Sequence, residues 1–301
     1  MGGLVRCGRL EESAMFFFIG VGVVLVAVFG GYVANDGHLP ALWQPFEFII
    51  IVGAAIGAFI IANPKTVLSA VAKEFPKVFK GPKYNTASFV ELLVMQNVIF
   101  KLAKSKGAMA LETHVENPED SSLFQQYPSF LADHHAVEFF CDFFRMLIMG
   151  ADNPHEMESL MDARIEVHHH ESLEVSHAIT GMADGMPALG IVAAVLGVIH
   201  TMGSITEPPE VLGHLIGGAL VGTFLGVLIS YGFVAPMASM LKAVADSEVR
   251  YYICMRSGII AYMQGYAPIM AVESARMVLM AHDQPSFADI EQAIDNAPAA
   301  A

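Results

Sequence analysis

Charged residues are scarce in this chain. They make up 15% of its 301 residues, whereas soluble domains carry about 25%. Hydrophobic residues make up 54%, and the mean hydropathy is +0.52. This composition disfavours a soluble protein and predicts membrane-spanning helices. The formal net charge of −14 argues against nucleic acid as a partner.

Cysteine is also rare. The three cysteines, Cys7, Cys141 and Cys254, are widely spaced, which predicts neither a disulfide framework nor a zinc site and indicates a reducing compartment. The consecutive histidines at 168–170 would point in different directions on a helix, so we expect no metal site there. The sequence has no nucleophile elbow, P-loop or metal-ligand spacing, so we expect neither an enzyme nor a cofactor.

Four long runs contain almost no charge. A helix of about 20 apolar residues crosses a bilayer, and soluble helices seldom run this long without charge. In the second run we expect Glu47 near one membrane interface, which Trp43 marks. The predicted fold is an all-α membrane protein with four transmembrane helices and a large helical cytoplasmic domain. The runs cover residues 15–34, 43–62, 186–205 and 211–241.

The positions of lysine and arginine predict the orientation. Loops 35–42 and 206–210 contain neither residue, whereas 65–83 contains five lysines and Lys242 follows the fourth run. Both termini and the large central segment are therefore expected in the cytoplasm. The predicted segments are an N-terminal leader at 1–14, transmembrane helices 1–2 at 15–63, a cytoplasmic helical domain at 64–185, transmembrane helices 3–4 at 186–241, and a C-terminal cytoplasmic helical segment at 242–301.

The leader does not resemble a cleavable signal peptide. It is either a short cytosolic leader or a sign that translation starts at Met15, and the second alternative is favoured. In the cytoplasmic domain, the apolar spacing of residues 89–107 predicts a helix. Asn153 and Pro154 predict the start of a long polar helix, and residues 116–122 and 125–129 predict breaks between helices.

Glycines recur at helical spacing in the apolar runs. Such faces let helix backbones approach closely in lipid. They could pack within the chain or against other chains, and their number favours other chains. The glycines are Gly53 and Gly57, Gly190 and Gly197, and Gly218, Gly222 and Gly226.

Ionisable residues are absent from the first, third and fourth runs. An ion pathway usually needs such a group near the membrane midplane, so we expect a partner helix to supply the carboxylate. Thr223 is the best-placed local polar group, although its hydroxyl could instead bond to the preceding turn. Pro187 predicts a helix start, and Pro236 predicts a kink. We expect both prolines at one membrane depth, where they could form a flexible or ion-lining level.

Several motifs together resemble the MotA family of flagellar motor stator subunits, over nearly the whole chain from Met15. They are "FGGY" at 29–32, "QPFE" at 44–47, "ALE" at 110–112, "ENPE" at 116–119, "YPSFLAD" at 127–133, "GMPALGIVAAVLGVIHTMG" at 185–203, "VGTFLG" at 221–226, "YGFVAPMA" at 231–238 and "GYAP" at 265–268.

The resemblance implies a multi-pass protein of the bacterial inner membrane. Five copies would surround two copies of a MotB-type partner, whose aspartate would carry the ion. Pro187 and Pro236 would lie beside that aspartate, and Thr223 would line the ion route. Sodium-driven relatives tend to carry threonines where this chain has Ala193 and Ala194, so the resemblance favours protons.

The resemblance also implies a contact with the rotor protein FliG. Lys104 matches the basic position of that contact and Glu112 the acidic one, with Lys106 as a neighbouring candidate. Taken without the family, these charges would be an ordinary solvated face. The sequence leaves three alternative functions. They are an ExbB- or TolQ-like energiser of outer-membrane transport, a membrane scaffold without ion flux, and a self-contained secondary transporter.

Overall fold

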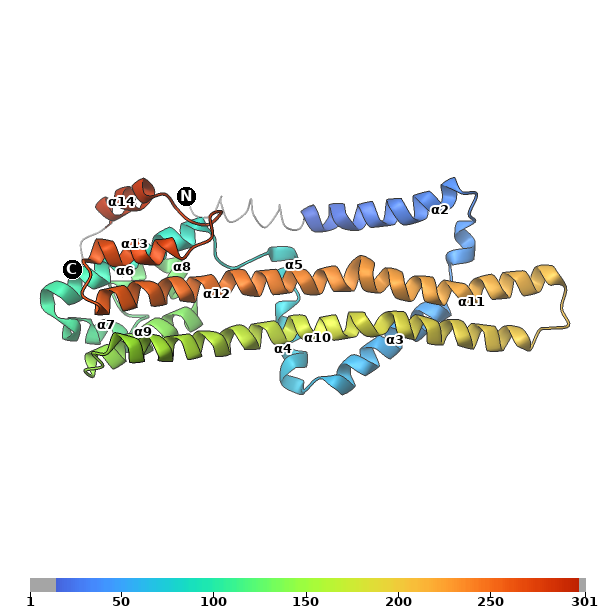
Figure 1. The fold of residues 1–301 in the computed structure, drawn as a ribbon, viewed down its shortest axis with the longest axis horizontal. Coiled ribbons are helices and arrows are strands. Elements are labelled where there is room, and N and C mark those ends of the chain that lie inside the picture. The colour runs from blue at the N-terminus through green and yellow to red at the C-terminus, as the bar shows by residue number, and fades with distance from the viewer. Residues whose placement is uncertain (1–14, 298–301) are drawn as a thin grey trace. The chain divides into compact units, whose positions relative to one another are not determined.

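The computed structural model describes residues 15–297 (Figure 1). The expected leader at 1–14 lies outside these residues. The described part consists of helices joined by turns, without a β-strand. It divides into two compact units. Of the described residues, the first unit contains 15–81 and 171–244, and the second contains 82–170 and 245–297.

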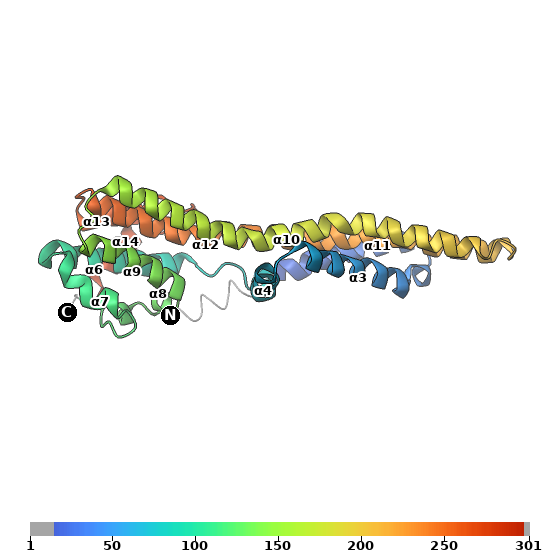
Figure 2. The same cartoon turned by 90° about the horizontal axis from the view of Figure 1, so that it is seen from below.

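The first unit contains the apolar helices. The helical run Met15–Ala34 includes a π-helical turn, η1 (Val26–Gly30), and ends in α2 (Gly31–Ala34). Next come η2 (Leu39–Leu42), α3 (Pro45–Ala62), α4 (Lys65–Glu74) and α5 (Lys77–Lys80). The unit is completed by part of α10 (Pro154–Met202), by α11 (Pro209–Ile229), by the π-helical turn η5 (Ser230–Val234) and by part of α12 (Ala235–Met263). Figures 1 and 2 show α10 and α11 side by side, and α3 contacts α11.

The second unit is built around α6 (Thr86–Lys106). Asn85 caps its first turn by accepting a 3.0 Å hydrogen bond from the backbone N–H of Ser88. The apolar spacing of this segment correctly predicted the helix, and its apolar side chains are buried. The other elements of the unit are η3 (Ala108–Leu111), α7 (Glu112–Glu116), η4 (Phe124–Gln126), α8 (Pro128–Leu131), α9 (His134–Ile148), α13 (Pro268–Met277) and α14 (Phe287–Asp295).

Five helical runs in the described part are long and apolar enough to cross a membrane. One of them, Thr86–Lys106, has 67% of its most apolar window buried inside the protein. A helix buried this well by protein is a core helix rather than a lipid-facing one. The other four cover the runs identified in the sequence, except that the third helix ends at Met202, three residues before the expected end of its run, and at most 22% of their windows is buried. The count of four spans stays a prediction.

The expected helix start at Pro187 is wrong. The helix begins at Pro154, as the sequence around Asn153 predicted, and continues through Pro187 to Met202. The π-helical turn η5 ends at Val234, two residues before Pro236, where a kink was expected. A π-helical turn contains one extra residue and is frequent at functional sites.

Candidate functional site

The backbones of α10 and α11 touch at their glycines. A methyl group placed on Gly190 would lie 2.8 Å from the carbonyl oxygen of Gly222 and 3.1 Å from Cα of Gly226. A methyl group on Gly197 would lie 2.7 Å from Cβ of Ala219. Distances this short leave no room for a side chain, so these glycines allow the helices to approach. For α10 and α11 the glycine faces therefore pack within the chain.

The remaining glycines differ in their surroundings. A methyl group on Gly218 would lie 3.0 Å from Nε2 of Gln44, so this glycine accommodates a polar side chain. Methyl groups on Gly53 and Gly57 of α3 would meet nothing within 4 Å. The glycine face of α3 is therefore open in the single chain, and its contact with other chains stays a prediction.

Ser230 supplies the hydrogen bond that Pro187 cannot make. Pro187 has no N–H to donate to the carbonyl of Ala183, four residues before it. The buried hydroxyl of Ser230 donates to this oxygen at 2.6 Å. A proline inside a transmembrane helix is tolerated when a neighbouring helix satisfies the freed carbonyl in this way. This contact is the physical reason why α10 does not begin at Pro187.

The two prolines do not lie at one depth. Pro187 is next to Met186, whose carbonyl oxygen would lie 2.8 Å from a methyl group on Gly226. Pro236 instead lies two residues before Ala238, whose carbonyl accepts a 2.8 Å hydrogen bond from Ser176. Because α12 runs antiparallel to α10, Pro236 lies level with about residue 178 of α10, roughly nine residues before Pro187. At 1.5 Å of rise per residue, this is a separation of roughly 13 Å along the axis of α10. The expectation of a shared level is therefore wrong.

The other expected ion-route residues lie together where α10 meets α11. A methyl group on Gly222 would lie 3.0 Å from Cβ of Ala193 and 3.1 Å from the backbone nitrogen of Ala194. Thr223 follows Gly222, and its Cα would lie 3.3 Å from a methyl group on Gly190. The structure thus brings Ala193, Ala194 and Thr223 to one contact. Whether they conduct ions stays a prediction.

Glu47 reaches the same contact, which the sequence did not indicate. Its Oε2 would lie 3.0 Å from a methyl group on Gly222, and its Oε1 3.3 Å from one on Gly197. Glu47 lies in the first turn of α3, four residues after Trp43, and its place near a membrane interface stays a prediction. The carboxyl fits against Gly197 and Gly222 because glycine leaves space that any other residue would fill. In the sequence, Glu47 stood out only as the last residue of the "QPFE" motif, which does not indicate a contact with α10 or α11.

The expected rotor-contact residues lie on consecutive elements of the second unit. Lys104 and Lys106 are in the last turn of α6, and Glu112 begins α7. Gly107, with φ of 85°, follows α6 and leads into η3. All three charged side chains are exposed. They are therefore accessible in the single chain, and their role stays a prediction.

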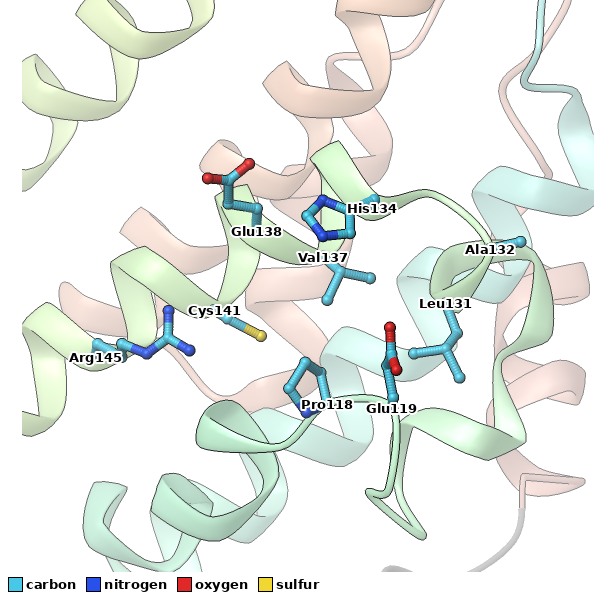
Figure 3. Close-up of a pocket in the computed structure, with 9 residues that line it drawn as sticks. All are labelled: Pro118, Glu119, Leu131, Ala132, His134, Val137, Glu138, Cys141 and Arg145. Atoms are coloured by element: carbon cyan, nitrogen blue, oxygen red, sulfur yellow. The ribbon is translucent and has the colours of Figure 1, made fainter.

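A cavity of about 370 Å³ lies in the second unit (Figure 3). Burial raises the pKa of the Cys141 thiol in its wall to about 12, so this thiol is protonated at neutral pH. Arg145 donates from Nε to Glu116 at 2.9 Å and from Nη1 to Asp142 at 2.7 Å. The cavity therefore offers neither an activated nucleophile nor an uncommitted guanidinium. It is lined by Pro118, Glu119, Leu131, Ala132, His134, Val137, Glu138, Cys141 and Arg145.

The histidines at 168–170 contact different residues, as their helical positions predicted. Nε2 of His169 lies 3.3 Å from Oδ1 of Asp246, whereas the ring of His168 packs against that of Tyr252 with centroids 4.6 Å apart. Among residues 15–297, no group of three histidine, cysteine, aspartate or glutamate side chains is arranged to hold a metal ion.

A buried carboxylate holds the start of the second unit in place. Asp133, of which 2% is exposed, pairs with Nζ of Lys83 at 2.9 Å and accepts a hydrogen bond from the hydroxyl of Tyr84. Burial alone would raise the pKa of Asp133, but the hydrogen bonds from Lys83 and Tyr84 outweigh burial and lower it. The ring of Tyr84 stacks on that of Tyr251, with centroids 3.9 Å apart.

Comparison with known proteins agrees with this arrangement. Residues 18–107 match the family model for the motility protein A N-terminal region, and residues 132–253 match that for the MotA/TolQ/ExbB proton channel family. Motility protein A of Salmonella typhimurium is 39% identical over 92% of this chain and 94% of its own length. The chain belongs to the motility protein A family. The resemblance seen in the sequence motifs is therefore confirmed.

Other relatives extend this result. Motility protein A of Escherichia coli is also 39% identical, over 92% of this chain and 94% of its own length. Chemotaxis protein LafT of Vibrio parahaemolyticus is 36% identical over 91% of this chain and 96% of its own length. As a member of a proton channel family, this chain is a membrane protein and not an enzyme.

Solved structures show the same fold. The flagellar MotAB stator complex from Bacillus subtilis contains a chain that matches with a TM-score of 0.67 and 26% identity, over 88% of this chain and 96% of that one. C. jejuni MotAB contains one with a TM-score of 0.72 and 21% identity, over 89% of this chain and 96% of that one. The all-helical architecture of this motility protein A relative is therefore shared with chains of stator complexes.

Proposed function

We propose that this chain is the stator subunit of a bacterial flagellar motor. It would assemble as a ring of five copies around two copies of a MotB-type partner in the inner membrane, with four spans and both termini in the cytoplasm. Protonation of the partner's aspartate would move the ring, and Lys104 and Glu112 would transmit torque to FliG. The observation that carries the proposal is the 39% identity to motility protein A over 92% of the chain.

The arrangement of α10 and α11 supports proton-coupled movement. Two helices in backbone contact at Gly190 and Gly226 can move as one body, because no side chains separate them. The bond between Ser230 and Ala183 holds the proline-interrupted part of α10 against η5. Ala193 and Ala194, at positions where sodium-driven relatives tend to have threonine, favour the proton as the ion.

The alternative function is an ExbB- or TolQ-like energiser of outer-membrane transport, because the family model that matches residues 132–253 includes those proteins. The match of residues 18–107 to the motility protein A N-terminal region favours the stator. A scaffold without ion flux would not require Pro187.

The test is motility of a strain lacking this gene. We expect flagellated cells that do not swim and that recover swimming with the unaltered gene. Pro187→Ala should reach normal membrane levels, measured by blotting, yet fail to restore swimming. A deletion strain that swims normally but loses uptake across the outer membrane would overturn the stator proposal in favour of the energiser.

A further inference from the structure

The carboxyl group of Glu47 is an unused ionisable group in the first unit. Glu47 lies in the first turn of α3, and both its oxygens face glycines of other helices, Oε1 that of α10 and Oε2 that of α11. Its Oε2 is buried and accepts no hydrogen bond within the described part of the chain. An ionised carboxylate without a hydrogen-bond donor is unfavourable against an apolar helix pair. The carboxyl group of Glu47 is therefore expected to be protonated for part of the time.

The surroundings of Glu47 strengthen this argument. The oxygens lie against Gly197 within the predicted span 186–205 and against Gly222 within the predicted span 211–241. An ionised carboxylate packed against apolar transmembrane helices is costly, and such groups mark ion or proton pathways. The neutral acid avoids this cost, so the site favours binding of a proton.

The position also coincides with the ion-route residues. The same Gly222 contacts Cβ of Ala193 and the backbone of Ala194, and Thr223 follows it in the chain. Few other groups on these helices can titrate. Glu47 is the one ionisable residue of α3, α10 contributes His200 within the span 186–205, and α11 contributes Glu210 and His214 close to the outer loop.

We infer that Glu47 is a proton-binding site on the ion route of this subunit. Uptake from the outer side converts a hydronium ion and the carboxylate into water and a neutral carboxylic acid, with the new O–H bond at the glutamate. Release reverses this step, and a water molecule or the partner's carboxylate accepts the proton. The inference rests on the proposed function for the direction of transfer but not for the binding itself.

Three variants test the inference in the complete complex with its partner. Glu47→Gln keeps the shape of the side chain and removes its titration, Glu47→Asp keeps the carboxyl, and Glu210→Gln is the control in an exposed position. We measure the rotation speed of motor-driven beads against external pH, after checking membrane level and partner co-purification. Glu47→Gln should rotate slower by on the order of tenfold, Glu47→Asp should retain part of the speed, and Glu210→Gln should match the unaltered chain.

Infrared difference spectra of the purified complex in lipid provide a readout independent of rotation. Between acid and alkaline pH, the unaltered complex should show a carbonyl stretch of a protonated carboxyl group that Glu47→Gln lacks. If Glu47→Gln does not assemble, Glu47→Asp takes its place, and the band must shift in frequency. Spectra that do not change with the residue at position 47 would overturn the inference.

The two proposals fail in different ways. If the unaltered chain does not support rotation, the stator function is wrong, while the spectra still decide whether Glu47 binds a proton. If the unaltered chain supports rotation and Glu47→Gln rotates at the same speed with the same dependence on pH, only the proton-binding site is wrong.

Discussion

The hydroxyl of Ser230 donates a 2.6 Å hydrogen bond to the carbonyl oxygen of Ala183. The two residues belong to different helical segments, and the bond occupies the oxygen that Pro187 leaves without its usual donor. A buried carbonyl without a donor would destabilise the fold by about 1–3 kcal/mol. The serine in η5 therefore allows a proline to remain inside a continuous helix.

Ser230→Ala should lower the free energy of unfolding by about 1–3 kcal/mol, because it leaves the Ala183 carbonyl buried without a donor. Thermal unfolding of the purified protein in detergent measures this change. Ser239→Ala is the matched control, since the exposed Ser239 hydroxyl bonds to its own helix at Ala235, and it should change stability by less than about 0.5 kcal/mol. Equal effects of the two variants would contradict the prediction.

Gly226→Ala should separate α10 from α11. The added methyl group would lie 2.8 Å from Cα of Gly190 and from the carbonyl oxygen of Met186, and backbone atoms cannot move aside as a flexible side chain can. The expected loss of stability is about 1–3 kcal/mol, measured by thermal unfolding, together with loss of swimming. Gly213→Ala lies on the same helix where a methyl group meets nothing within 4 Å. If both variants unfold at the same temperature, the backbone contact between α10 and α11 does not contribute the predicted stability.

Asp133→Asn should destabilise the second unit in a pH-dependent way. The pKa of Asp133 is lowered in the folded state, so the ionised group stabilises the fold above the unfolded pKa of about 4. This contribution is lost as the pH falls through the lower folded pKa. We expect the Asn variant to lose about 1–3 kcal/mol at pH 7, less than for a fully buried pair because Lys83 is partly exposed.

Denaturant unfolding at several pH values measures the effect of Asp133→Asn. The difference between the variant and the unaltered protein should shrink as the pH falls below about 4. Asp142→Asn is the control, because the pair of Asp142 with Arg145 is exposed and worth about 0–1 kcal/mol. If Asp133→Asn lowers the free energy of unfolding by the same amount at every pH, the charge of Asp133 is not responsible for the loss of stability.

Lys104→Glu should weaken the contact with the rotor while leaving the fold intact, because the side chain is exposed at the end of α6. Exposed charge pairs contribute about 0–1 kcal/mol each, so we expect swimming to be reduced rather than abolished. Glu291→Lys reverses an equally exposed charge on α14 and should swim normally. Membrane levels of both variants are measured by blotting. Normal swimming of Lys104→Glu would count against the rotor contact.

Much of the fold could be predicted because it depends on local patterns. Uncharged runs located the apolar helices, and the spacing of Phe89, Leu92 and their neighbours located the core helix α6. The start of α10 was also predictable, since Asn153 accepts a 3.1 Å hydrogen bond from the backbone N–H of His155 in the first turn. These signals lie within a few residues of the features that they predict.

The misplaced features depend on residues far apart in the chain. Nothing near Pro187 distinguishes a first-turn proline from one inside a helix, because the deciding donor, Ser230, lies 47 residues from the oxygen it satisfies. The contact of Glu47 likewise depends on Gly197 and Gly222, which belong to other helices. Sequence periodicity cannot report such contacts, whereas the glycines themselves could be read as sites of close approach.

The chain contains a single tryptophan, Trp43, and 79% of it is exposed. Indole emission from the isolated chain therefore comes from one position, four residues before Glu47. Brominated lipids quench this emission according to the distance between the bromine and the ring. A series of such lipids, brominated at successive positions along the acyl chain, would measure the depth of the residues that lead into α3. The native sequence thus contains its own optical label beside the carboxyl of Glu47.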